Sequence, residues 1–362
     1  MSYTYQEASR AFKNDHIREL SLDREGRRFL KLRSLSRKTL MDRLIREHHL
    51  IIPDASGQKL FQLLYESPLN EQQIEQTIRN IYEEERHVRQ AIEAQLVSEL
   101  YRVVSFDWGG LHQNSLEKTI VDNYVKRIRM YDELCDNIDN KLYPSMKAYV
   151  FCSWYNHWTS IIIEDIFKDH PNVLPAVGLI KKIDFFIKDI PFDLKVTYLP
   201  EGFIKEYRRD HHLRPELTML KQFCRERNLY FSQDLPEAQL LEDLWAKVRD
   251  HPSEIARELI TQLKDVRLQI LQSVRKHPET LIRWLYENQG VRRFDASNRL
   301  FLVLVDESDF FGSWKLKRAK SLLGQEIYRH LDRITEHPGY NIDFEWDGNI
   351  YTTNADMILI SH

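Results

Sequence analysis

The sequence predicts an α/β fold in which a mixed sheet is flanked by helices. Three observations lead to this prediction. Apolar residues recur at helical spacing over much of the chain, as in residues 36–50. The period changes to that of β-strands over residues 179–199. Residues 300–305 are apolar without interruption, which is typical of a strand at the centre of a sheet.

The composition is that of a globular protein with a sizeable core. The chain has 362 residues, of which 42% are hydrophobic and 30% charged, and its formal net charge is −3. This length allows one large domain or two ordinary ones. We find no apolar run of 18 residues, no signal peptide at the N-terminus and no CxxC pair among the three cysteines. We therefore expect a cytoplasmic protein with reduced thiols, no membrane contact and no zinc ribbon.

Residues 1–105 are expected to form a separable helical domain. Residues 36–50 and 70–98 have helical periodicity, and the second of these stretches is strongly acidic. Residues 1–50 carry twelve Lys or Arg against seven Asp or Glu, and such a local basic patch lets a near-neutral protein bind a polyanion. A DNA-binding domain of helix-turn-helix type and a helical packing domain both remain open.

The following segments lead into the sheet. After a loop at residues 108–113, the spacing of residues 114–117 is that of a capping box, which opens a helix. A second helix begins at Pro144 and runs to about Lys168. This helix is apolar on nearly all sides, so we expect it in the core.

A β-hairpin is predicted next. Residues 179–187 form its first strand and residues 188–191 the connection. The second strand, residues 192–199, alternates in polarity, which places Asp193 and Lys195 on one face and the apolar residues on the other.

The rest of the chain returns to helices and then completes the sheet. Residues 203–298 form a long helical insertion with breaks at prolines. The central strand at 300–305 is followed by a basic helix from Trp314 to Ile334. Residues 340–353 read as a hairpin with Asp-Gly at its turn, and residues 357–360 are expected to add an edge strand.

Three carboxylates and a lysine fall where these elements converge. Glu164 lies near the end of the buried helix, and Asp184 lies within the first strand. Asp193 and Lys195 are two residues apart on the second strand and therefore share a face.

These residue types suit the hydrolysis of a phosphodiester. Such a bond resists hydroxide, and a hard divalent cation helps by neutralising the developing charge and acidifying water. Mg²⁺ takes oxygen ligands, so Asp184, Asp193 and the backbone carbonyl of Leu194 suit it. A lysine beside the metal, here Lys195, can orient or deprotonate the attacking water.

The set Glu164, Ile183-Asp184 and Asp193-Leu-Lys195 resembles the PD-(D/E)XK nuclease core, as found in type II restriction endonucleases. Eight residues separate Asp184 from Asp193, which is within the range of that family's hairpin. The later strand and basic helix resemble the second half of the same core. The proline of the "PD" motif is replaced by Ile183, and the sharp match covers only residues 160–199 or so.

The resemblance implies a restriction-endonuclease-like domain over residues 106–362 and a Mg²⁺-dependent endonuclease that cleaves double-stranded DNA, with Mn²⁺ as a substitute metal. It implies that Asp184 and Asp193 bind the metal, that Lys195 stands beside the water, and that Glu164 is an accessory acid. Cleavage of both strands needs two active centres, so a homodimer is expected. A restriction enzyme is the first expectation, and a nuclease of repair, transposition or phage defence is the alternative.

Other interpretations of the same residues stay open. Asp193 and Lys195 could be a surface pair on a solvated sheet face, although this would not explain Asp184 within Ile-Asp-Phe-Phe-Ile. Glu164 could be an ordinary solvated helix residue. The protein would then be a non-catalytic DNA-binding protein whose acids are structural.

Basic residues after the central strand are candidate contacts for DNA phosphates, although a solvated helix face explains them equally well. They are Lys315, Lys317, Arg318 and Lys320. For His157 and His170 a packing or capping role is the simpler interpretation. The neighbouring pairs His48-His49 and His211-His212 point apart on a helix and are poor metal chelators.

Overall fold

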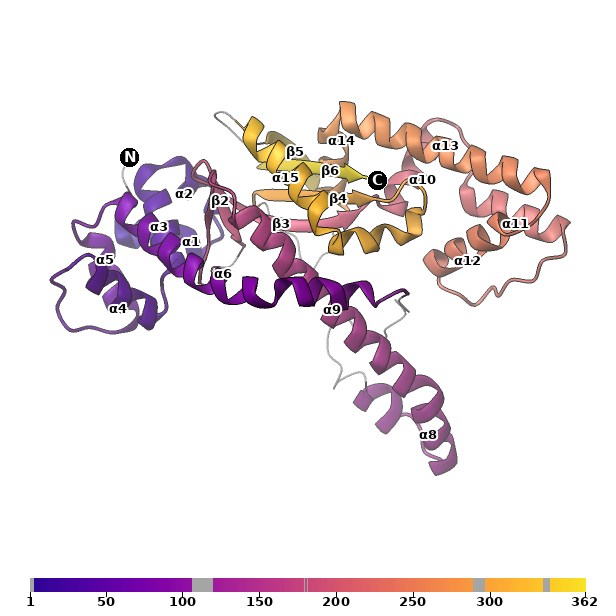
Figure 1. The fold of residues 1–362 in the computed structure, drawn as a ribbon, viewed down its shortest axis with the longest axis horizontal. Coiled ribbons are helices and arrows are strands. Elements are labelled where there is room, and N and C mark those ends of the chain that lie inside the picture. The colour runs from indigo at the N-terminus through magenta and orange to yellow at the C-terminus, as the bar shows by residue number, and fades with distance from the viewer. Residues whose placement is uncertain (1–2, 106–119, 179, 181, 289–296, 335–338) are drawn as a thin grey trace.

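An open sheet of six strands, in the order β1-β2-β3-β4-β6-β5, forms the centre of the computed structural model (Figure 1). The structure describes residues 3–105, 120–178, 180, 182–288, 297–334 and 339–362. The strands are β1 (Val173–Pro175), β2 (Phe185–Ile187), β3 (Ile190–Tyr198), β4 (Arg299–Val305), β5 (Tyr340–Trp346) and β6 (Asn349–Ser361). β3, β4 and β6 run parallel, and the other neighbouring pairs are antiparallel. The fold is therefore mixed α/β, as predicted.

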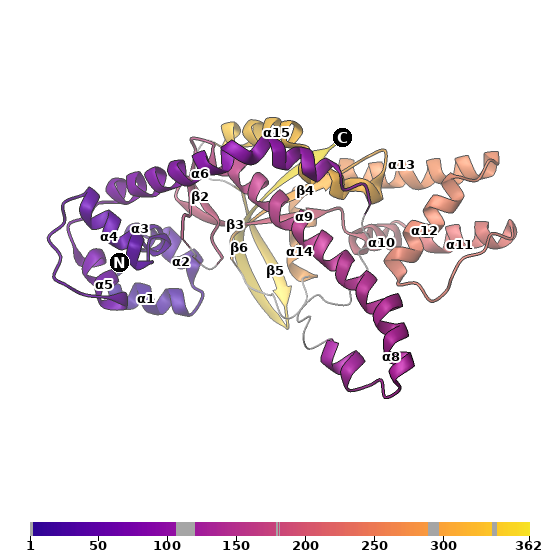
Figure 2. The same ribbon diagram turned by 60° about the horizontal axis from the view of Figure 1, so that its bottom comes forward.

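Helices surround this sheet and extend well beyond it on either side. They are α1 (Tyr5–Lys13), α2 (Ile17–Leu22), α3 (Arg24–Ser34), α4 (Lys38–Glu47), α5 (Gly57–Glu66), α6 (Glu71–Tyr101), α8 (Tyr131–Asn137), α9 (Tyr143–Lys168), α10 (Glu201–Asp210), α11 (Glu216–Glu226), α12 (Glu237–Arg249), α13 (Glu254–Lys276), α14 (Pro278–Glu287) and α15 (Lys320–Arg333). In both views α1–α5 gather at one end of the molecule, α11 and α12 lie at the other, and α8 projects to one side (Figures 1 and 2). No helix in the described part of the chain combines the length and the apolar character that a membrane crossing requires.

The central strand β4 is buried along its whole length and packs on both faces. On one face, Leu300 and its i+2 neighbours join the core formed with α9 and α15. On the other face, Phe301 and its i+2 neighbours join the core formed with α13 and α14. This two-sided burial explains why the strand has an unbroken apolar sequence, and the prediction of a central strand is confirmed.

The N-terminal helices share their core with the start of the sheet. Side chains of α1–α6 pack together with Leu174 of β1, Phe186 of β2, and Ile180 and Ile183 between these strands. Capping boxes at Thr4 and Asn70 open α1 and α6. Residues 3–101 are thus predominantly helical, as predicted, and the strand region contributes buried apolar surface to them.

Whether residues 1–105 can be separated from the rest stays a prediction, which limited proteolysis tests. Ser56 and Gly57, at the start of α5, are exposed, and Gly57 has a φ of 55°. We expect cleavage there or near residues 108–113, which lie outside the described residues, as does the capping box expected at 114–117. A chain that resists proteases throughout residues 50–115 would count against a separable region.

The expected strand over residues 179–187 is wrong in its extent. Only Phe185–Ile187 pair as a strand, because Lys182 has a φ of 66° and interrupts the extended backbone. Asp184 therefore precedes β2 instead of lying inside it. The short strand β1 was not predicted.

Three further predictions need correction. The first half of α9 is not in the core: Tyr143 and Val150 are exposed, and only the second half is buried against the sheet. The basic helix expected over 314–334 is a 3₁₀ helix (Phe310–Arg318) followed by α15, because Ala319 departs from helical dihedrals. Residues 357–360 are not an edge strand but part of β6, which lies between β4 and β5.

The predicted helical insertion corresponds to α10–α14, which connect the parallel strands β3 and β4. Pro215 and Pro236 directly precede helices and Pro278 begins one, so the prolines mark helix starts as expected. α11 and α12 form a small core of their own with the first half of α13. The rest of α13 and α14 cover one face of the sheet.

Candidate active site

The β2–β3 hairpin positions both candidate aspartates. Lys188 and Asp189 have φ angles of 48° and 68°, so they form a two-residue turn of the type that suits a tight hairpin. The register ends with Phe185 opposite Phe192, so Asp184 and Asp193 are the residues that lie directly beyond this last pair on the two sides of the hairpin. The Asp184 amide donates to the Phe192 carbonyl at 2.8 Å, which holds the backbone at this point.

Strand β3 divides its side chains between two faces, as its alternation predicts. Phe192 is fully buried in the core with α9, and Leu194 and Val196 pack against the same core. Asp193 and Lys195 therefore point to the opposite face. The Lys195 ammonium donates to Asp193 Oδ1 at 2.7 Å, and its side chain is 46% exposed against 12% for Asp193.

Arg299 of β4 is a member of this site that the sequence did not reveal. The parallel register pairs it with Asp193, and its Nε lies 3.6 Å from Asp193 Oδ2. Its guanidinium is buried and lies 5.1 Å from the ring centroid of Tyr286. The signal that the sequence offered for this residue was an arginine at the start of an otherwise apolar strand. Asp193 thus lies between two cations, Lys195 on its own strand and Arg299 on the next.

The carboxyl group of Asp184 has an unusual environment. Burial raises its pKa from the ordinary 3.8 to about 6. A hydrogen bond from the Leu194 amide at 2.7 Å opposes this shift, as does the charge of Lys168, while the negative charges of Glu164 and Asp193 add to it. Asp184 is therefore close enough to both Glu164 and Asp193 to be affected by their charges.

Glu164 lies on α9, which packs against the face of β3 opposite to that of Asp193 and Lys195. Its carboxylate accepts a hydrogen bond from Lys168, one helical turn later, at 2.7 Å, and both side chains are partly buried. This i,i+4 pair fixes the glutamate on the side of α9 from which it acts on Asp184. The contact that Glu164 makes is with Lys168, so its role as an accessory acid stays a prediction.

The donor set suits a hard divalent cation. Two carboxylates and the nearby Leu194 carbonyl offer oxygen ligands, which Mg²⁺ prefers. The pKa of Asp184 is raised mainly by burial, with a smaller contribution from the charges of Glu164 and Asp193, and a bound cation would favour the ionised carboxylate. In the described ranges, three carboxylates approach within 4.8 Å of one another only at Glu71, Glu75 and Asp189. Glu164 is therefore too far from the aspartates to be a third direct ligand in this conformation.

The basic residues predicted to contact phosphates have partners within the chain. Those contacts are Lys315 with Asp309, Lys317 with Asn156, Arg318 with the carbonyls of Leu100 and Val103, and Lys320 with Glu93. Arg318 is buried, and burial lowers the pKa of Lys317 to about 8. Arg318 and Lys317 therefore serve the packing of the 3₁₀ segment, while phosphate contact by the more exposed Lys315 and Lys320 stays a prediction.

The histidines have packing and capping contacts of the kind expected. His157 packs its ring against Trp158, and His170 packs against Tyr328. His170 also accepts from the Asn172 amide and contacts Asp332 at 3.1 Å. These contacts account for both residues without a role at the candidate site.

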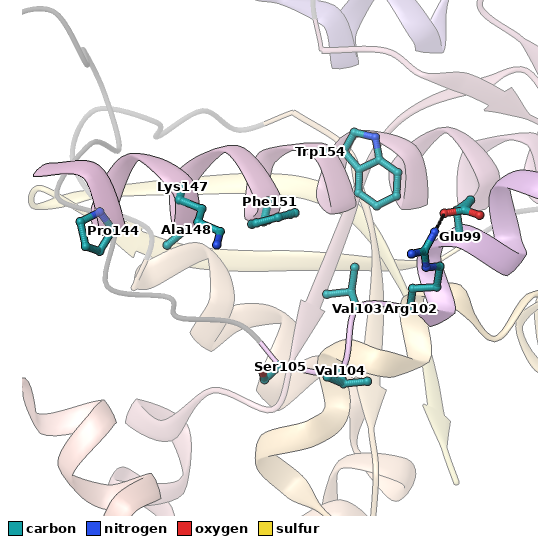
Figure 3. Close-up of a pocket in the computed structure, with 10 residues that line it drawn as sticks. All are labelled: Glu99, Arg102, Val103, Val104, Ser105, Pro144, Lys147, Ala148, Phe151 and Trp154. Carbon is teal, nitrogen blue, oxygen red and sulfur yellow. Dashed lines mark hydrogen bonds and ion pairs between the residues drawn. The ribbon is translucent and has the colours of Figure 1, made fainter. Parts of the chain in front are cut away.

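A separate cavity of about 660 Å³ lies beside the first half of α9 (Figure 3). Phe151 and Trp154 of α9 and Val103 after α6 give it apolar walls, as the close-up shows. Glu99 and Arg102 at its edge are paired with each other at 2.8 Å. None of the candidate catalytic residues lines this cavity, so it adds no group to the site.

Comparison of the chain with models of protein families, with characterised proteins and with solved structures finds no match. Its function therefore has to be inferred from the chemistry of the site. That site consists of Asp184 just before β2, Asp193 on β3, a lysine bonded to Asp193, and a glutamate on α9.

Proposed function

We propose that this protein is a metal-dependent endodeoxyribonuclease whose active centre is formed by Asp184, Asp193 and Lys195. The observation that supports this most is the hairpin geometry, in which the Asp184 carboxylate accepts from the Leu194 amide, next to Asp193, and the Lys195 ammonium lies 2.7 Å from Asp193. A surface ion pair would explain Lys195 and Asp193 alone. It would not explain why a second carboxyl group, that of Asp184, is held near them with a raised pKa.

The order of elements supports a restriction-endonuclease-like fold. The buried half of α9 is followed by the antiparallel strands β1, β2 and β3, and then by β4, α15 and β6. This is the succession of helix, strands, helix and strand that the PD-(D/E)XK resemblance implies. The helices between β3 and β4 and those before α9 are additions to that core, and recognition of double-stranded DNA would fall to them.

The mechanism follows from what each residue can do. Asp184, Asp193 and the Leu194 carbonyl would hold Mg²⁺, with Mn²⁺ as a substitute, and such an ion supplies charge neutralisation and an acidified water. Lys195 is half exposed beside Asp193, so it can orient the attacking water or accept a proton from it. Arg299 stays buried behind Asp193 and holds that carboxylate in place. Glu164 adds negative charge near Asp184 and is an accessory acid.

The test is to incubate the purified protein with plasmid and phage DNA in the presence of Mg²⁺, Mn²⁺ or EDTA and to sequence the ends produced. We expect metal-dependent double-strand breaks with defined ends. Metal-independent DNA binding without cleavage would instead identify a non-catalytic DNA-binding protein. Defined ends at one short sequence, with an adjacent methyltransferase gene, would identify a restriction enzyme rather than a nuclease of repair, transposition or phage defence.

We also predict that the protein acts on DNA as a homodimer in the cytoplasm. The described chain offers a single set of Asp184, Asp193 and Lys195, and cutting both strands at one site needs two such sets. The free thiols of its three cysteines fit a reducing compartment. Sedimentation with a cognate duplex should show two chains per duplex. A complex of one chain that still cuts both strands at once would exclude the dimer.

A further inference from the structure

Lys31 of α3 lies at the centre of a buried ionic cluster. Its side chain has no exposed surface, and its ammonium lies 2.6 Å from carboxylate oxygens of both Glu71 and Glu75 of α6. The third partner is Asp189, at 2.5 Å, in the turn between β2 and β3. The cluster therefore joins two helices of the N-terminal region to the hairpin of the candidate active site.

The chemistry of this cluster is complete without a metal. An ammonium group has three N–H donors, and each can meet one of the three carboxylates. Burial alone would lower the pKa of Lys31, but the hydrogen bonds to Asp189, Glu71 and Glu75 outweigh it and raise the pKa above its ordinary value. Lys31 is thus a permanent cation in the position that a metal ion would otherwise take among these carboxylates.

The position of Asp189 gives the cluster its consequence. Asp189 is in the two-residue turn whose geometry sets the hairpin register, and Asp184 and Asp193 lie directly beyond the last pair of that register, Phe185 with Phe192. Ile183 and Phe186, which precede this turn along the chain, are buried in the core of the N-terminal helices. The N-terminal region therefore holds the hairpin both by apolar packing and by an ionic bond at its tip.

We propose that Lys31 is a positioning residue for the candidate active centre. By binding Asp189 it fixes the β2–β3 turn against α3 and α6, and thereby fixes the spacing of Asp184 and Asp193 at which a divalent cation binds. This inference rests on the proposed function. It adds that the N-terminal helices set the metal affinity of the site, although they supply no metal ligand.

The variant that tests this is Asp189→Asn. Asparagine tolerates the positive φ of this position, so the turn is kept while the ionic bond to Lys31 is lost. The side chain of Asp189 is 53% exposed, so the change leaves no buried cavity. The matched control is Glu75→Gln, which removes one carboxylate from the same ammonium without touching the hairpin.

Two measurements are made on the full-length chain, namely thermal stabilisation by Mn²⁺ or Ca²⁺ and cleavage of plasmid DNA as Mg²⁺ is varied. Outer partners of metal ligands change metal affinity by roughly 10–100-fold, and for this more distant contact we expect a rise of about three- to tenfold in the half-saturating metal concentration of Asp189→Asn. Its maximal rate at saturating Mg²⁺ should stay within about twofold of wild type, because no group at the reacting atoms is removed. Glu75→Gln should match wild type in both measurements.

A merely structural role predicts a different pattern, in which both variants lower the melting temperature alike and neither changes the metal dependence. Equal metal affinities for Asp189→Asn and Glu75→Gln would therefore overturn the positioning role while leaving the nuclease proposal intact. A wild-type protein that is neither stabilised by metal nor able to cleave DNA would overturn both proposals.

Discussion

Lys195→Ala is expected to lower the rate of DNA cleavage by about 10²–10⁴-fold, the range by which a positioned acid or base contributes to catalysis. The metal should still bind, because both aspartates and the Leu194 carbonyl remain. DNA binding should also survive, since phosphate contacts elsewhere supply most of the affinity. The side chain is 46% exposed and β3 stays paired on both sides, so the fold should be unaffected.

The control for charge removal is Lys205→Ala. Lys205 of α10 is similarly exposed, at 52%, and its partner is Glu237 of α12, which is not part of the candidate site. The Lys205→Ala protein should cleave DNA as the wild type does. Ca²⁺ should support DNA binding by all of these proteins with little cleavage, because its looser ligand shell positions the water poorly. Full Mg²⁺-dependent cleavage by pure, folded Lys195→Ala would refute the assignment of the site.

Asp184→Ala and Asp193→Ala should abolish cleavage for another reason, which is loss of the metal. Their effects on stability should differ in sign. Asp193 lies between Lys195 and the buried Arg299, so its removal takes one carboxylate away from a buried guanidinium and costs about 1–3 kcal/mol. Asp184 has a raised pKa, so its removal relieves an unfavourable buried charge.

The parts of this site that the sequence predicted are those set by local patterns. Alternation along β3 is enough to place Asp193 and Lys195 on one face, because side chains of a strand alternate whatever it pairs with. The turn at Asp347-Gly348 was likewise predictable, since both residues have the positive φ that a tight hairpin requires and that glycine adopts readily. Periodicity was also sufficient for α9 as a helix.

The parts that the sequence could not supply depend on which segments meet. Arg299 becomes a partner of Asp193 only through the pairing of β3 with β4, across the α10–α14 connection. Lys31 meets Asp189 across an even longer stretch of chain. Apolar periodicity also does not show which half of α9 packs against the sheet. Val150, in the first half, is exposed, whereas Ile163, in the second half, is buried. The basic run at residues 315–320 was misleading because Arg318 donates to backbone carbonyls instead of facing solvent.

Asp184→Asn should make the metal-free protein more stable at pH 7 and not at pH 4. A pKa raised from 3.8 to about 6 means that the folded state holds the proton more tightly than the unfolded state. This group's contribution to stability is therefore fully present below pH 3.8 and is lost as the pH rises through 6. The loss amounts to about 3 kcal/mol at most, at 1.36 kcal/mol for each pH unit.

Asparagine removes that loss because it carries no charge and can still accept the hydrogen bond from the Leu194 amide. Urea unfolding of both proteins at pH 4, 5, 6 and 7 should give equal stabilities at pH 4 and an advantage of about 1–3 kcal/mol for the variant at pH 7. Mg²⁺ should reverse the order at pH 7 by stabilising only the wild type, since binding to the folded state alone adds to its stability. Asp193→Asn, which leaves Arg299 without its carboxylate, should be destabilised at pH 7. An Asp184→Asn protein that is no more stable than wild type at pH 7 without metal would show that this carboxyl group does not carry the buried charge on which the metal site depends.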